Sequence, residues 1–324
     1  MGAAERSLFA CAPAAYPRAM LQFLARRLLV ALLVCATVLT FAFVLTRLGG
    51  DLAISIAGAN ATAEDIAVVR KAYGLDKPLV QQFFDWVGRA AVGDFGQSYF
   101  YKERVAKLIV DRLPITFALG LVGLAIALVV ALPLGVISAL NEGRLVDRLT
   151  AFVAIIGQAM PSFWLGLILM ITLGLKLGWL PVSGTGSWQH FVMPGIVLAF
   201  SAIPAMMRLT RSGMIDALGS DYIRTARAKG LSRRSIVLKH AARNAAMPVV
   251  SIAAVQLGFM LGGSIVIETV FALHGVGYLA WESISKNDFP TVQAVVLLLA
   301  CIYILLTLGA DLLNAVLDPR LRAS

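Results

Sequence analysis

Six apolar stretches most constrain how this chain can fold, because each is long enough to cross a lipid bilayer. They comprise residues 28–45, 113–140, 149–175, 191–209, 245–267 and 291–310. Arg208 is the one Lys, Arg, Asp or Glu within them. A helix of about 20 mainly apolar residues spans the hydrocarbon layer. The sequence therefore predicts an all-α polytopic membrane protein with six transmembrane helices.

Composition supports a membrane protein rather than a soluble domain with one buried core. Hydrophobic residues make up 59% of the 324 residues and charged residues only 14%. The net charge of +10 is explained by Lys and Arg beside the cytoplasmic ends of spans, rather than by nucleic-acid binding. Cys11, Cys35 and Cys301 have no CxxC spacing and the histidines are scattered, so no metal site is predicted.

The N-terminal segment carries no structural pattern of its own. Residues 1–19 are interpreted as a disordered extension, unless translation starts at Met20. The first transmembrane helix is expected within residues 20–46, behind Arg26 and Arg27. Its apolar run is long for a signal peptide and no convincing cleavage site follows. We therefore expect an uncleaved anchor with a cytoplasmic N-terminus.

Residues 47–112 are the one sizeable region expected outside the membrane on the opposite face. Thr62 followed by acidic residues is typical of a helix start, and Gly74 is expected to end that helix. A second amphipathic helix is expected after Pro78. The region is thus predicted to be helical and extracytoplasmic.

A basic loop at residues 211–247 separates the fourth and fifth spans. Helix-forming residues from Asp221 onward lead to Gly230, where a helix should stop, and Ser232 then supplies an N-cap for a second helix. Each Lys or Arg in mid-membrane costs roughly 2.5 to 3.5 kcal/mol, so this loop is expected at the inner aqueous face. The small residues Ala226 and Ala228 are expected to let another protein approach the turn closely.

The sequence DYIRTARAKGL at residues 221–231 resembles the "EAA" coupling segment of ATP-binding-cassette (ABC) importer permeases. It is most similar to the dipeptide/oligopeptide/nickel subfamily. In the generic motif Gly follows Glu-Ala-Ala by four residues, whereas here Arg224-Thr225-Ala226 precede Gly230, so the acidic residue is absent. Further stretches resemble the family: GDFGQS at 93–98, PSFWLG at 161–166, GWLPVSG at 178–184, ETVFALHGVGY at 268–278 with His274 in place of Pro, and LDPR at 317–320.

The resemblance covers roughly residues 20–322 and implies a type I ABC importer permease fold. Residues 113–318 would form the permease core with five transmembrane helices, and residues 319–324 a cytoplasmic tail. The expected partners are a second homologous permease subunit, two cytoplasmic ATPase subunits, an extracytoplasmic substrate-binding protein and membrane lipid. The expected location is the bacterial inner membrane, with both termini cytoplasmic.

The resemblance also implies that a short helix docks on an ATPase subunit and transmits its motion to the spans. The residues that match the coupling segment are Asp221, Tyr222, Arg224, Thr225, Ala226, Ala228, Lys229 and Gly230. The chain has no G-x-x-x-x-G-K-[ST] sequence, so it is not expected to be an enzyme. ATP and Mg are expected in the ATPase partners, with no cofactor held by this chain.

Polar residues within or beside the spans are candidates for the translocation pathway. They are Gln158, Ser162, Gln256, Ser264 and Glu268. Such residues face a bundle interior or a water-filled path, or make hydrogen bonds between helices. Glu268 has the further alternative of a simple interfacial charge. Pro161, Pro194 and Pro204 are hinges or static kinks.

The substrate expected from the resemblance is a di- or oligopeptide. Nickel, glutathione or another small solute carried by the same importer class is the alternative. A stand-alone secondary transporter would instead show inverted repeats and buried ionisable groups, and a membrane-embedded enzyme would show a nucleophile, an acid–base pair or a metal set. None of these features is evident in the sequence.

Overall fold

The computed structural model describes residues 16–48, 51–58 and 60–317. Over these residues the regular secondary structure is helical, apart from one isolated bridge between Gln97 and Arg104. Five helices there are long and apolar enough to cross a membrane. They are α1 (Tyr16–Leu48), α5 (Val105–Leu140), α8 (Val192–Gly219), α11 (Ala242–Val270) and α13 (Phe289–Leu317). The predicted all-α membrane fold is confirmed.

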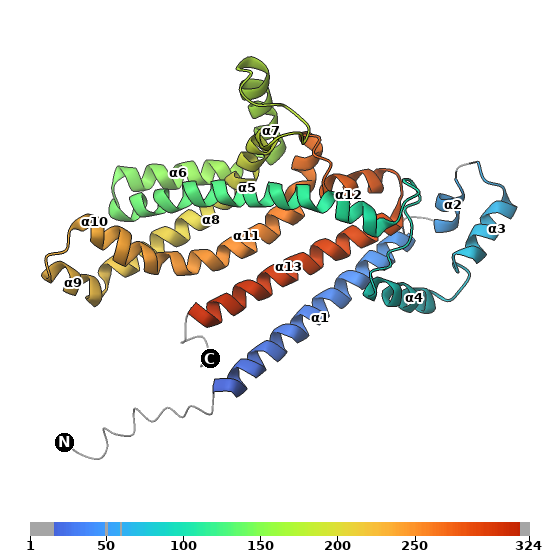
Figure 1. The fold of residues 1–324 in the computed structure, drawn as a ribbon, viewed down its shortest axis with the longest axis horizontal. Helices are drawn as coiled ribbons and strands as arrows, with labels where there is room; N and C mark the ends of the chain where they lie inside the picture. Colours follow the sequence, from blue (N-terminus) through green and yellow to red (C-terminus); the bar gives the residue numbers. More distant parts are fainter. Residues whose placement is uncertain (1–15, 49–50, 59, 318–324) are drawn as a thin grey trace, which may run out of the picture.

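The remaining predicted span, residues 149–175, is a bent pair of helices rather than one rod. α6 (Leu145–Ala159) is followed by α7 (Ser162–Leu169) and the π-helical η1 (Met170–Lys176), with a bend of 99°. The bend falls at Met160 and Pro161, whose ψ angles are 126° and 129°. A residue before proline is sterically disfavoured in the α-helical region, so the helix ends there. Figure 1 shows α7 turning away from the layer of α5, α6 and α8.

The core of the bundle lies where α8 packs between α5 and α11. Leu119 of α5, Met193 and Met206 of α8 and Ile267 of α11 are almost completely buried in one cluster. α8 runs ten residues past the predicted end of its span, to Gly219. Hydropathy marks where the chain leaves hydrocarbon, and a helix can continue beyond that point into water.

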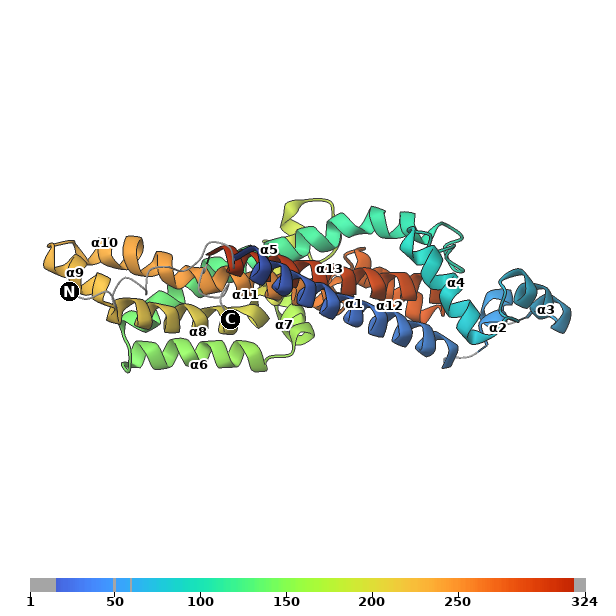
Figure 2. The same ribbon diagram turned by 90° about the horizontal axis from the view of Figure 1, so that it is seen from below.

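The first and last transmembrane helices pack side by side along one flank of this core. α1 lies beside α13 in both views of the ribbon (Figures 1 and 2). Arg27 and Asp311 form an ion pair between them, with Nη1 and Oδ2 2.7 Å apart. Leu32 on the other side of α1 is 69% exposed, as expected for a helix that faces lipid.

The extramembrane region is helical, as predicted. It contains α2 (Leu52–Ala57), α3 (Ala63–Ala72) and α4 (Leu79–Ala91). These helices lie at the opposite end of the molecule from α9 (Asp221–Ala228) and α10 (Arg233–Ser235) (Figure 1). Thr62 caps α3, because its hydroxyl accepts a hydrogen bond from Asp65 N while Asp65 accepts one from Thr62 N. Phe83 of α4 packs edge-on against Phe43 of α1, which joins this region to the bundle.

Two helices extend beyond the predicted spans. Residues 268–290, between the last two predicted spans, contain the end of α11 and the additional helix α12 (Val276–Ser285). α1 begins at Tyr16, four residues before Met20. Residues 1–15 and the predicted tail 319–324 lie outside the described residues.

Candidate coupling site

The segment that resembles the coupling motif forms the short helix α9 (Asp221–Ala228) directly after α8. Ser220 breaks the helix between them with an extended ψ of 155°. α9 ends as predicted: Lys229 is the C-cap and Gly230 has φ +78°. Glycine adopts this left-handed conformation without the steric cost that a side chain brings. α9 and the following helix stand at one tip of the molecule (Figure 1).

One face of α9 is anchored to the rest of the chain. Ile223 is completely buried and Ala226 is 8% exposed, and both pack in a cluster with Met214 and Ala217 of α8 and with Val237. The Ala226 side chain therefore packs on this chain's own core, while Ala228 lies on the exposed face. Burying the apolar face of so short a helix holds it in one orientation on the bundle.

The other face of α9 is exposed. Asp221, Tyr222, Arg224, Thr225 and Ala228 are exposed on it, and Lys229 and Gly230 at its end are exposed too. Asp221 and Arg224 approach to only 3.9 Å with side chains 99% and 89% exposed, so their attraction is screened by water. This face therefore presents polar groups that are free to contact another molecule.

A second link runs from α9 to the start of α11. Asn244 Nδ2 donates a hydrogen bond to the Tyr222 hydroxyl over 2.8 Å. Between the two helices, Ser232 caps α10 (Arg233–Ser235) as predicted, and the π-helical η3 (Ile236–Ala241) continues into α11. Ile236, Val237 and Ala241 are buried, and His240 is half-buried. α9 is thus connected to both α8 and α11.

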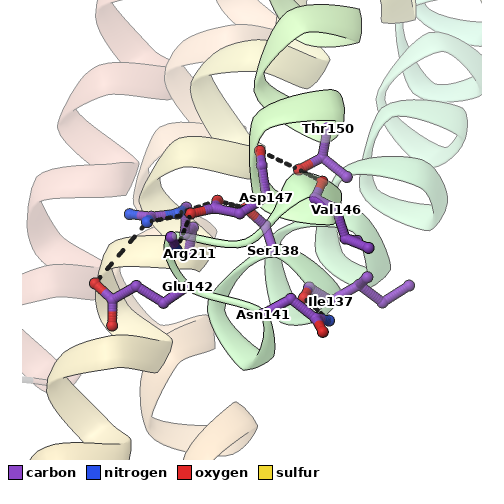
Figure 3. A network of polar contacts seen from close by, with 9 residues as sticks. Ile137, Ser138, Asn141, Glu142, Val146, Asp147, Thr150 and Arg211 are labelled. Atoms are coloured by element: carbon purple, nitrogen blue, oxygen red, sulfur yellow. Dashed lines mark hydrogen bonds and ion pairs between the residues drawn. The ribbon is translucent and has the colours of Figure 1, made fainter.

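A partly buried ion pair joins three helices, α5, α6 and α8, near the same end of the molecule (Figure 3). Asp147 at the start of α6 accepts two hydrogen bonds from Arg211 of α8, from Nε over 2.7 Å and from Nη2 over 2.8 Å. It also accepts from the Ser138 hydroxyl of α5 over 2.5 Å and from Gly143 N over 2.9 Å. A two-point Arg–carboxylate contact fixes orientation as well as distance. α5, α6 and α8 are therefore held together beside α9.

Nothing in the sequence singles out this network. Asp147 lies in the polar stretch 141–148 between two predicted spans, whereas Arg211 lies in the basic loop 211–247. They are 64 residues apart in the chain, and only the antiparallel packing of α6 and α8 brings them together. The available signal was two acidic residues, Glu142 and Asp147, between two predicted spans, and an Arg shortly after a third span.

The predicted pathway residues fall into two groups. Gln158 and Ser162 are exposed on either side of the α6–α7 bend, and Gln256 is half-buried. Ser264 and Glu268 are instead almost completely buried and hydrogen-bonded to each other over 2.9 Å. Glu268 is therefore buried rather than exposed at the end of its span, and both side chains lie between helices of this chain.

The Glu268 carboxylate joins α11 to α5 and α12. It accepts hydrogen bonds from the Thr116 hydroxyl over 2.8 Å and from Tyr278 N over 2.8 Å, while the Thr116 oxygen accepts from Val276 N. A Cβ at Gly275 would lie 2.6 Å from Glu268 Oε2, so the backbone approaches the carboxylate too closely for a side chain there. This explains why position 275 in the ETVFALHGVGY stretch is Gly. The turn itself forms with His274 in place of Pro.

No group of three or more His, Cys, Asp or Glu side chains that could hold a metal ion occurs among the described residues. The charged groups near α9 are mainly cations, and the acids found there are paired with Arg or exposed. Such an arrangement suits contact with another protein rather than acid–base chemistry.

Comparison with known proteins identifies the family. Residues 131–323 match the family described as the binding-protein-dependent transport system inner membrane component. Residues 20–120 match the N-terminal family of the same membrane components. The two matches together leave little of the chain between residue 20 and its end unassigned.

Relatives match over nearly the whole chain. The glutathione transport system permease protein GsiC of Escherichia coli strain K12 is 41% identical over 305 residues, covering 94% of this chain and 99% of GsiC. The protein of the same name from Shigella flexneri serotype 5b gives the same identity and coverage.

A solved structure shares the fold. A chain of the inward-facing MetNI methionine ABC transporter superposes with a TM-score of 0.55 at 20% identity, covering 65% of this chain and 96% of that one. A second crystal form of that transporter gives a TM-score of 0.54. Together with the family matches and the relatives, these comparisons place the chain in the binding-protein-dependent transport family, as a multi-pass inner-membrane permease subunit of an ABC importer.

Proposed function

We propose that this permease subunit forms half of the translocation pathway of an importer for small peptides, glutathione among them. The observation that carries the proposal is the 41% identity to glutathione permeases over 94% of the chain. Glutathione is itself a tripeptide, so this substrate agrees with the predicted peptide subfamily. A second homologous permease, two ATPase subunits and a substrate-binding protein complete the proposed importer, with ATP and Mg bound by the ATPase subunits.

In this proposal α9 is the helix that contacts an ATPase subunit on the cytoplasmic side. Its exposed face offers Tyr222, Arg224, Thr225 and Ala228, followed by Lys229, to a partner. Ile223 on its opposite face packs on the bundle, and the hydrogen bond from Asn244 to the Tyr222 hydroxyl links α9 to α11. A force on the exposed face would therefore move α8 and α11 together with α9.

The Asp147–Arg211 pair extends this connection to the rest of the bundle. Arg211 lies in the C-terminal part of α8, and Asp147 connects it to α5 and α6. Closure of the ATPase pair on ATP would thus shift several spans as one body, and hydrolysis would let them return. Transport then needs two discrete packings of the spans rather than a gradual deformation.

Uptake measurements test the substrate. The assembled importer in proteoliposomes should accumulate labelled glutathione and dipeptides when ATP and the binding protein are supplied. Nickel ions are the comparison solute. Uptake of nickel without peptide uptake would overturn the peptide proposal, and uptake that continues without ATP would overturn the importer mechanism.

Substitution at Gly230 tests the coupling role. Gly230→Val should abolish uptake, because a β-branched residue is strained at φ +78° and the end of α9 must change shape. Membrane insertion should be unaffected. Gly219→Val is the matched control, since that glycine has no positive φ and no atom within 4 Å of a Cβ. Normal uptake by Gly230→Val, or equal loss in the control, would refute this role.

Cross-linking tests contact with the ATPase directly. A cysteine at Ala228, on the exposed face of α9, should cross-link to the ATPase subunit in the assembled importer. A cysteine at Val68 of α3, which is 68% exposed at the opposite end, should not. Cross-linking from Val68 but not from Ala228 would reverse the proposed orientation.

A further inference from the structure

A cavity of about 550 Å³ lies at the end of the bundle opposite α9. Its walls come from the end of α1, the α3–α4 turn, α4, the hairpin around Tyr99 and the start of α13. The charged side chains that line it are Arg47, Lys71, Lys77, Asp85 and Arg89. This volume lies within the range of small-molecule sites.

The cavity carries unbalanced positive charge. Lys77 and Asp85 pair with each other at 2.8 Å, which leaves Arg47, Lys71 and Arg89 with no acidic partner among the described residues. Arg47 lies over the Phe43 ring at 4.9 Å, and its Nε is buried without a hydrogen-bond partner. A guanidinium N–H that is buried and unpaired is costly, and an anion would satisfy it.

The remaining titratable groups at the cavity do not cancel this charge. Burial raises the pKa of the Tyr99 hydroxyl, which therefore stays neutral. Asp288 lies behind Tyr99 and already accepts hydrogen bonds from the Ser98 hydroxyl over 2.5 Å, Tyr99 N over 2.9 Å and the Thr291 hydroxyl over 2.7 Å. The cavity is thus cationic at neutral pH.

An apolar groove of about 490 Å³ adjoins this cavity and runs down the outside of the bundle. Phe289 and Gln293 of α13 line both spaces. Most of the groove wall is apolar; its members include Val38, Phe41, Ala42, Leu45, Ile284, Val292 and Val296. At its upper end the Ser283 hydroxyl is buried without a partner.

The level of the two spaces in the membrane follows from the spans that border them. Arg47 is the last residue of one span and Phe289 is the first residue of another, so the cavity lies where hydrocarbon gives way to headgroups. The groove lies below it, between the same two spans. Any membrane helix can face acyl chains. This groove differs from an ordinary lipid-facing surface because it adjoins a cationic cavity.

We propose that the cavity and groove together hold one anionic phospholipid, with its phosphate among Arg47, Lys71 and Arg89 and an acyl chain along α1 and α13. Arg recognises phosphate through paired N–H donors, and each cation near an anionic lipid contributes about five-fold to affinity. The apolar groove favours this ligand over a free anion, because a free anion has no acyl chain to contact the groove. The lipid would fill the seam between the extramembrane region and the bundle.

Native mass spectrometry of the full chain in its assembled importer tests the proposal. The complex is supplied with phosphatidylglycerol or phosphatidylcholine of the same acyl chains, and the lipid retained per chain is measured. Phosphatidylglycerol should be retained preferentially. Arg47→Gln combined with Arg89→Gln should weaken that retention about 25-fold. Arg104→Gln is the matched control, because this exposed Arg on the same end lies outside the cavity lining.

Two further variants separate lipid from other occupants. Val296→Trp fills the groove from its exposed side and should reduce lipid retention without touching the cations. Arg47→Lys keeps the charge and should retain most binding, which guards against loss through misfolding.

Equal retention of the two lipids would overturn the proposal, as would equal loss in Arg104→Gln. Displacement by inorganic phosphate with no effect of Val296→Trp would instead identify a free-anion site. Absence of lipid because a partner protein covers the groove would also overturn it.

Discussion

The two ends of the bundle hold their charged side chains in different ways. At the α9 end, Arg224, Arg227 and Lys229 are exposed and the helix is anchored by apolar residues. At the opposite end, Glu268 and Asp288 are completely buried. Their carboxylates accept hydrogen bonds from hydroxyl and backbone N–H groups rather than from Lys or Arg.

This difference concerns the acidic side chains, and it agrees with the proposal that α9 contacts an ATPase subunit. A buried carboxylate with several donors fixes every backbone segment that supplies one, since each donor left unpaired is costly. Exposed cations cost little and remain available for another molecule. The end with α12 is therefore held together by hydrogen bonds within this chain. The α9 end is held by apolar packing, by the Asn244–Tyr222 hydrogen bond and by the Asp147–Arg211 ion pair.

Removal of the Glu268 carboxylate should have the largest effect on stability. Glu268→Ala leaves Tyr278 N and the Thr116 hydroxyl without their acceptor in a buried site, at a cost of roughly 2 to 5 kcal/mol in the free energy of unfolding. Glu268→Gln should cost less, because its amide oxygen still accepts one of these bonds. Unfolding of the purified chain in detergent measures both. Glu103→Ala, at an exposed acid on the same end, should change stability little; equal losses would show that burial is not the cause.

The Asp147–Arg211 pair should give the next largest effect. A double-mutant cycle with Asp147→Asn and Arg211→Gln should yield a coupling energy of about 1 to 3 kcal/mol, because the contact is two-pointed and largely buried. The same cycle on Asp221 and Arg224, exposed and 3.9 Å apart, should give less than about 0.5 kcal/mol. Similar coupling energies for the two pairs would contradict the prediction that the Asp147–Arg211 contact is the stronger one.

Local sequence chemistry predicted where helices begin and end. Thr62, Gly230 and Ser232 act as the caps and stop that their residue types indicate, since these depend only on neighbours in the chain. Five of the six predicted spans also followed from hydropathy as continuous helices, because apolar length is a local property, whereas the sixth is the bent pair α6–α7. The family itself was recognised from the order and spacing of short stretches.

Features that depend on packing were not predictable in the same way. The Glu268–Thr116 contact joins residues 152 positions apart, and nothing in either stretch indicates the other. The sequence indicates that Ala226 is an accessible small residue, yet in the structure it packs in a cluster with residues of η3. Pro161 was recognised as a kink or hinge, but the 99° angle depends on how α7 meets α11 and α8.

The smallest predicted effect concerns the N-cap of α3. This cap lies at the same end as Glu268 and Asp288 but outside their hydrogen-bond networks. Hydrogen bonds from the Thr62 side chain and backbone lower the pKa of Asp65. A carboxyl whose pKa is lowered on folding stabilises the folded state above its unfolded pKa, about 3.9, and loses that contribution as pH falls through its folded pKa. Amide protection in α3 should therefore be constant from pH 7 to about 5 and fall below about 4.

Thr62→Ala should lower amide protection in Ala63–Ala72 about five-fold at neutral pH, because the N-cap oxygen is lost. Hydrogen–deuterium exchange read by mass spectrometry and corrected for intrinsic rates measures this change. Leu79–Ala91 serves as the internal control and should keep its protection, since α4 is held by aromatic packing on α1. Equal loss of protection in both helices would mean that the extramembrane region unfolds as one unit. The local capping bonds would then contribute less than the contacts that join the region to the bundle.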